Sequence, residues 1–100
     1  MPRIRNDRND STDQLFRAIL SLRDLDECCR FFGDLLTVQE LSAFAQRLQV
    51  ARMLSEGKTY EAIRGEIATS SSTITRVNTE LRYGSGGYKM VLDRLRDQTE

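Results

Sequence analysis

Residues 57–82 hold two short apolar repeats that are separated by a polar break of serine and threonine. The first repeat is Tyr60, Ile63 and Ile67, and the second is Ile74, Val77 and Leu81. An interval of three to four residues places each set on one face of a helix. Two short amphipathic helices joined by a tight polar turn form a helix-turn-helix, so this stretch restricts the chain to a helical fold.

The ends of these two helices are also marked. Gly57 ends the helix before them, and Thr59 can accept the free N–H groups at the start of a helix that runs to about Ala68. The second helix begins within residues 69–73, any of which can cap it with a hydroxyl group, and it continues through Leu81.

The outward face of the second helix is polar. With its apolar repeat pointing inward, the outward residues are Ser72, Thr73, Thr75, Arg76 and Thr79. Small hydroxyl-bearing side chains let a phosphate approach a helix start, where free N–H groups and the helix dipole favour negative charge. The same face can read base edges in a major groove. From the spacing alone, a helical scaffold that binds no nucleic acid is an equal alternative.

Length and composition favour one all-α domain. The chain has 100 residues, a single proline and few runs typical of strands. We expect a flexible N-terminal arm over residues 1–11 and one domain over residues 12–100. Because the sequence has no bilayer-length apolar run and no signal-peptide core at its start, we expect a cytoplasmic protein without membrane contact.

Charge gives only weak support for a nucleic-acid partner. Fifteen basic and fifteen acidic residues cancel, whereas a strongly basic domain would favour DNA directly. Residues 41–82 are mildly positive, with six basic and four acidic side chains. A dimer would present that charge twice.

We expect neither an enzyme nor a cofactor. The chain has no histidine, and it contains no nucleophile motif or paired carboxylates that would form a catalytic site. Cys28 and Cys29 are adjacent, so on a helix they diverge by about 100° and are poorly placed to bind one metal ion. We interpret them as buried, reduced thiols.

Four more helices are predicted, at about residues 12–22, 25–35, 38–55 and 88–96. Asp24 is the expected cap of the second, and Thr37 with Glu40 forms a capping box for the third. The third helix is apolar over a wide arc, which is typical of a central helix. The first two helices carry more apolar surface than a small monomer hides, and this predicts a homodimer rather than a six-helix monomer.

Four features resemble the Trp repressor family. They are LLT at residues 35–37, Arg47, the Leu-x-x-Gly that ends at Gly57, and TITR at residues 73–76. The similarity to the repressor covers about residues 35–82, and similarity to the YerC/YecD-related branch extends from Leu15 to the last helix. The resemblance implies a six-helix subunit in an intertwined homodimer, whose paired helix-turn-helix units enter successive major grooves of double-stranded DNA.

The resemblance also implies a set of DNA contacts. The position of Arg64 approaches DNA in the repressor, and the positions of Ser71, Ser72 and Thr75 contact the operator. Together with the outward face and the helix start, the predicted DNA-binding residues are Arg47, Arg64, Ser70, Ser71, Ser72, Thr73, Thr75, Arg76 and Thr79. Glu61 stands where the repressor has an arginine, so the operator sequence does not carry over.

The ligand site of the family is altered in this chain. The predicted ligand pocket consists of Thr37, Arg47, Arg76, Val77 and Glu80. In the repressor an indole ring lies between the two arginines, but Val77 replaces a glycine and Glu80 replaces a serine. Because Val77 fills part of the indole volume, we do not expect L-tryptophan to be the effector, and a sealed pocket or another small molecule is preferred.

The sequence therefore predicts a homodimeric, sequence-specific DNA-binding transcriptional regulator that acts as a repressor. The alternative is a helical protein-interaction module without specific DNA binding, which the neutral charge and Glu61 favour. The pattern itself does not distinguish the two.

Overall fold

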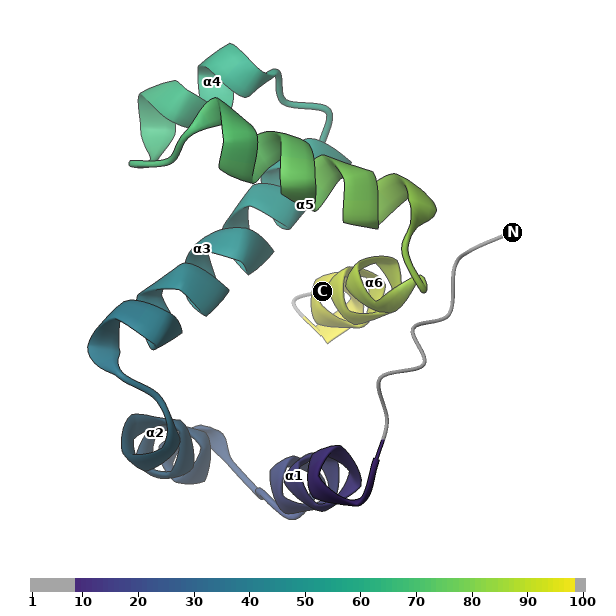
Figure 1. Ribbon diagram of the computed structural model, residues 1–100. Helices are drawn as coiled ribbons and strands as arrows, with labels where there is room; N and C mark the ends of the chain where they lie inside the picture. The colour runs from purple at the N-terminus through teal and green to yellow at the C-terminus, as the bar shows by residue number, and fades with distance from the viewer. Residues whose placement is uncertain (1–8, 99–100) are drawn as a thin grey trace. The chain divides into compact units, whose positions relative to one another are not determined.

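The computed structural model describes residues 9–98, and within them it contains six α-helices and no strand (Figure 1). The helices are α1 (Asp10–Leu20), α2 (Leu25–Leu35), α3 (Val38–Ser55), α4 (Tyr60–Glu66), α5 (Ser71–Tyr83) and α6 (Gly87–Gln98). The predicted all-α, six-helix subunit is confirmed.

Helix boundaries agree with the prediction for α2 and α3 and differ slightly elsewhere. α1 begins at Asp10, two residues early, because Asn9 and Thr12 form a capping box. The Thr12 N–H donates to the Asn9 side chain (3.0 Å), and the Asn9 N–H donates to the Thr12 hydroxyl (2.8 Å). Residues 10 and 11 of the predicted arm are therefore helical, and its residues 1–8 lie outside the described residues.

The predicted caps of α2 and α3 are confirmed. The Asp24 carboxylate accepts the Glu27 N–H at 2.9 Å. At the start of α3, the Glu40 N–H donates to the Thr37 hydroxyl (3.1 Å), and the Thr37 N–H donates to the Glu40 carboxylate (2.8 Å). A cap of this kind contributes about 1 kcal/mol and defines where the helix starts.

Of the described residues, 9–43 form one compact unit and 44–98 form another, and α3 runs through both. In the first unit no residue of α1 or α2 is buried. Phe31 and Phe32 pack edge to face, with ring centroids 5.5 Å apart. Cys28 is half-buried and Cys29 is exposed, so the expectation of buried thiols is wrong for this subunit. Among the described residues, no side chain of α2 is buried.

The second unit contains the core. Its buried hydrophobic residues are Val50, Ala51 and Met53 from α3, Ile63 from α4, Ile74 and Val77 from α5, and Leu92 from α6. α5 packs against both α4 and α6 (Figure 1). Only the C-terminal part of α3 is buried, whereas Phe44 and Leu48 are exposed. The core thus forms around the inward faces of the helix-turn-helix, which leaves the opposite faces open.

Candidate nucleic-acid interface

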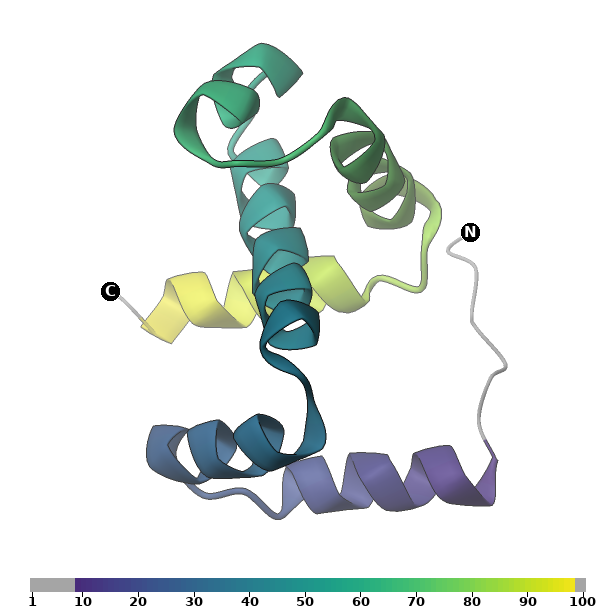
Figure 2. The ribbon, with the colours of Figure 1, turned by 60° about the vertical axis from the view of Figure 1, so that its left-hand side comes forward.

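α4 is short and is held at both ends. The Thr59 side chain accepts the Ala62 N–H at 3.1 Å, which caps the helix as predicted. An ion pair between Lys58 and Glu66 (2.9 Å) joins the segment before the helix to the last residue of the helix. α4 ends at Glu66 rather than near Ala68. The Ile67 N–H still makes the helical bond to the Ile63 carbonyl, but the backbone of Ile67 is extended, so the chain leaves the helix there. Residues 67–70 therefore form the interhelical link, which Figure 2 shows between α4 and α5.

The start of α5 is a cluster of hydroxyl groups. Ser70 is the N-cap, and its oxygen accepts the Thr73 N–H at 3.2 Å. The same oxygen lies 3.0 Å from the hydroxyl oxygens of both Ser72 and Thr73. Because these side chains are short, the exposed first turn of α5 presents its backbone with little steric cover.

Arg64 connects α4 to this cluster. Its Nη1 donates to the Ser71 hydroxyl oxygen at 2.8 Å. Both residues are exposed. The two positions that resemble DNA-contacting positions of the repressor thus lie side by side, although they are seven residues apart in the chain.

The predicted DNA-binding residues are accessible on the described surface. Exposed are Arg47, Arg64, Ser70, Ser71, Ser72, Thr75, Arg76 and Thr79, while Thr73 is half-buried. The Thr79 hydroxyl donates to the Thr75 carbonyl within α5 (2.9 Å), so its proton is used in a hydrogen bond inside the helix. Arg47 lies on α3, with its guanidinium 5.6 Å from the centre of the Phe44 ring.

The residues of the predicted ligand pocket occupy different settings. Val77 is only 2% exposed and belongs to the core beside Ile74. Arg76 is exposed and Glu80 is half-buried on the same helix. Thr37 caps α3 in the unit of residues 9–43. Val77 is thus a core residue, as its place in the apolar stripe predicts.

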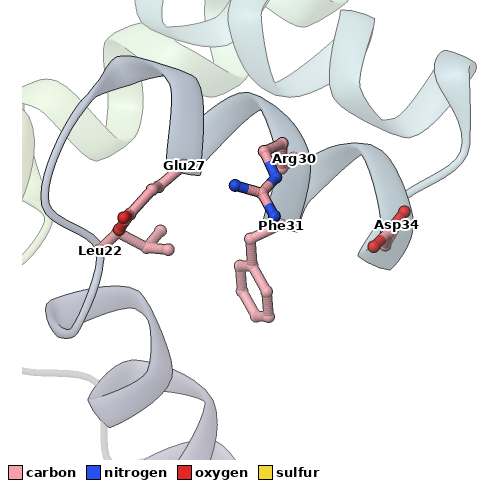
Figure 3. Close-up of a pocket in the computed structure, with 5 residues that line it drawn as sticks. All are labelled: Leu22, Glu27, Arg30, Phe31 and Asp34. Carbon is pink, nitrogen blue, oxygen red and sulfur yellow. The ribbon is translucent and has the colours of Figure 1, made fainter.

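A separate hollow of about 330 Å³ lies in the unit of residues 9–43 (Figure 3). It is lined by Leu22, Glu27, Arg30, Phe31 and Asp34. None of the predicted DNA-binding or pocket residues belongs to it. Over residues 9–98, no group of three or more His, Cys, Asp and Glu side chains could hold a metal ion. No helix in that range has the length and apolar character needed to cross a membrane.

Two features of the interhelical link have no signal in the sequence. The Gln46 side chain donates to the Ala68 carbonyl at 2.6 Å, across 22 positions of the chain. The Thr69 hydroxyl oxygen is buried and has no hydrogen-bond partner among the described residues. Helical spacing relates residues three or four apart, so neither contact is predictable from periodicity.

Six helices, with α4 and α5 joined by a four-residue link, place the chain among helix-turn-helix proteins of the all-α class. The chain belongs to the Trp repressor family, since the family described as Trp repressor protein matches residues 10–96. The predicted resemblance is therefore confirmed.

Individual relatives match the chain over most of its length. The chain is 53% identical over 90 residues to the uncharacterized protein YerC of Bacillus subtilis (strain 168), covering 90% of this chain and 86% of that protein. It is 46% identical to a candidate Trp repressor from Staphylococcus aureus of known crystal structure, with a TM-score of 0.86 and 89% of each chain covered. A TrpR like protein from Eubacterium eligens ATCC 27750 gives 46% identity and a TM-score of 0.85, covering 88% of this chain and 91% of that one.

Proposed function

We propose that this protein is a sequence-specific DNA-binding transcriptional regulator that acts in the cytoplasm as a homodimeric repressor. One observation carries the proposal: the exposed hydroxyl cluster at the start of α5, joined to Arg64 of α4 at 2.8 Å, in a chain of the Trp repressor family. A helix start with short side chains and a basic neighbour suits a phosphate-lined groove.

In this proposal the charged residues bind phosphates and the hydroxyl residues read bases. Arg47, Arg64 and Arg76, with the helix N-termini, anchor the DNA backbone. Base edges are read by Ser71, Ser72, Thr73 and Thr75. Ser70 caps α5 and donates its hydroxyl proton to Thr73 Oγ1 (3.0 Å), and Thr79 donates within its own helix, so both support the surface and offer only acceptor capacity to DNA.

The contact between Arg64 and Ser71 supports this division of roles. A guanidinium has five N–H donors, and the bond to Ser71 uses one of them. The remaining donors are available to a phosphate oxygen, while the side chain is already held near the start of α5. Arg64 therefore loses less conformational freedom on binding than a disordered arginine would.

Exposed apolar side chains support a homodimer. Leu20, Leu25 and Val38 are 82%, 80% and 78% exposed, and Phe16, Leu35 and Leu41 are also exposed. Soluble monomers rarely expose so many large apolar groups over three consecutive helices. A second copy of the chain would cover them, as the family resemblance implies. Sedimentation equilibrium measures this directly, and a monomer at micromolar concentration would contradict it.

The proposed regulator does not use L-tryptophan as its effector. Val77 occupies a core position beside Arg76, where the family resemblance requires space for the indole ring. Inserting a ring into a packed site costs several kcal/mol, because neighbouring side chains must leave their preferred positions. The remaining alternatives are a sealed pocket and a different small molecule.

Selection of bound duplexes from a random pool, followed by salt titration, tests the DNA-binding proposal. Arg64→Gln should weaken binding to all duplexes and reduce the slope of log K against log salt by about 0.9 for each lost phosphate contact. Thr75→Ala should instead reduce discrimination between the selected and a scrambled duplex, by the roughly 1–3 kcal/mol typical of a base contact. Arg94→Gln, an exposed arginine of α6, is the charge-matched control.

An unchanged salt slope for Arg64→Gln would contradict the phosphate role. If the wild type selects no duplex that resists competitor DNA, the alternative of a helical protein-interaction module gains support. The exposed Glu61 on α4 and the net charge of zero are the observations that favour that alternative.

A further inference from the structure

The interhelical link, residues 67–70, determines where α5 begins. Ser70, its last residue, caps α5 through the Thr73 N–H (3.2 Å) and accepts the Ile74 N–H on its backbone carbonyl (3.1 Å). Any displacement of the link therefore moves the cap and the hydroxyl cluster together. The proposed contacts with DNA depend on the position of this segment.

The link lies against α3 through one side-chain hydrogen bond. Gln46 is half-buried on α3, and its Nε2 donates to the Ala68 carbonyl at 2.6 Å. Ala68 is two residues before the cap. On the other side of the link, Arg64 of α4 donates to Ser71, the first residue of α5. The link is thus held from α3 just before the cap and from α4 just after it.

Ile67 anchors the start of the link, because it packs against the core and its N–H donates to the Ile63 carbonyl (3.0 Å). The Thr69 hydroxyl oxygen is buried without a hydrogen-bond partner among the described residues, which is an unfavourable arrangement. Ala68 has no polar side chain. The bond from Gln46 joins the Ala68 carbonyl to α3, and it opposes movement of the part of the link that follows Ile67 away from that helix. It also couples the link to the turn of α3 that carries Arg47.

We propose that Gln46 is a positioning residue that sets how well the protein discriminates between DNA sites. It acts through the Ala68 carbonyl, by fixing the link and with it the first turn of α5. This inference rests on the proposed DNA-binding function. Binding groups must be held to within roughly 0.5 Å to act together, so loss of one anchor affects base reading before it affects charge attraction.

Gln46→Met is the test variant, because methionine has similar length and helix propensity but no donor. Gln49→Met, at an exposed position of the same helix, is the matched control. The first measurement is amide hydrogen exchange in the free protein. Exchange at Thr73 and Ile74 should become faster by roughly threefold to tenfold in Gln46→Met, and it should not change in Gln49→Met. Gln46→Glu, which presents an acceptor to the Ala68 carbonyl, should also make exchange at Thr73 and Ile74 faster.

The second measurement is the ratio of affinities for the selected and a scrambled duplex at several salt concentrations. Gln46→Met should lower that ratio by roughly threefold to tenfold and leave the salt slope unchanged, because no phosphate contact is lost. If Gln46→Met lost affinity equally for both duplexes and had a smaller salt slope, the inference would be overturned, since Gln46 would then be a contact with the DNA phosphate backbone. Unchanged exchange at Thr73 and Ile74 would also overturn it.

Failure of the underlying function has a different signature. If the wild type selects no duplex, the proposed function is wrong and the role of Gln46 in discrimination falls with it. If the wild type selects a duplex and Gln46→Met discriminates equally well, only the inference about Gln46 is wrong.

Discussion

Val77→Gly is the substitution that most directly tests how the family site has been altered. Val77 is 2% exposed and lies beside Ile74, which is 0% exposed, in the core of residues 44–98. Removing three buried carbons costs about 2.4 kcal/mol at roughly 0.8 kcal/mol per carbon. Valine is already a weaker helix former than alanine, so its replacement by glycine costs only a few tenths of a kcal/mol in helix propensity. Together the free energy of unfolding should fall by about 3 kcal/mol.

Urea denaturation at fixed protein concentration measures this loss. Thr75→Gly is the control, since Thr75 is exposed in the same helix and should lose only the helix-propensity difference, below about 1 kcal/mol. The loss of stability in Val77→Ala should lie between those of the other two variants, because alanine is a better helix former than glycine and the substitution deletes only two methyl groups. If Val77→Gly loses no more stability than Thr75→Gly, the assignment of Val77 to the core is wrong.

The same variant has a consequence for ligand binding. Isothermal titration calorimetry with L-tryptophan should give no measurable heat of binding for the wild type, because in the proposed site Val77 takes volume that the indole ring would need. The space opened in Val77→Gly should allow weak binding. Tight binding of L-tryptophan by the wild type would refute the reasoning about Val77.

Two further predictions concern stability and charge. Thr69→Val replaces a buried hydroxyl that has no partner among the described residues with a methyl group, so we expect the free energy of unfolding to rise by about 1 kcal/mol in urea denaturation; a loss of stability would show that the hydroxyl is satisfied. On α6, the hydrogen bond from Lys89 (3.0 Å), together with the charges of Lys89 and Arg96, outweighs desolvation and holds the pKa of the Asp93 carboxyl below its ordinary value. A lowered pKa in the folded state stabilises the protein above the unfolded-state pKa, and that contribution is lost as the pH falls through the folded pKa. Lys89→Met should therefore raise the Asp93 pKa towards its ordinary value in an NMR titration, and an unchanged pKa would contradict the pairing.

The exposed apolar faces of α1, α2 and the first part of α3 connect the sequence with the proposed assembly. Their amphipathic pattern predicts helices that each need a covering surface, and in this subunit no residue of α1 or α2 is buried. Cys28, which is half-buried, and Cys29, which is exposed, both lie on α2. A prediction of burial made from hydrophobicity alone does not say which chain supplies the cover.

Local chemistry in the sequence is enough to predict the six helices and the starts of α2, α3 and α4. Apolar spacing gave six helices, and the caps at Asp24, Thr37 and Thr59 lie where the helices begin. The same spacing predicts the inward positions of α5. In the structure Ile74 and Val77 are buried and Leu81 is half-buried. These features depend on residues within about four positions of each other, and that range is what a sequence pattern reports.

The tertiary structure alone decided how the candidate interface is held. Gln46 meets Ala68 across 22 positions, and Arg64 meets Ser71 across the link, because packing of the core brings α3, α4 and α5 to fixed positions. The early end of α4 at Glu66 is likewise set by the path the link takes to α5. The local sequence determines which helices form and which of their faces are polar. Contacts between residues that are distant in the sequence determine the positions of the polar faces of α4 and α5 relative to each other.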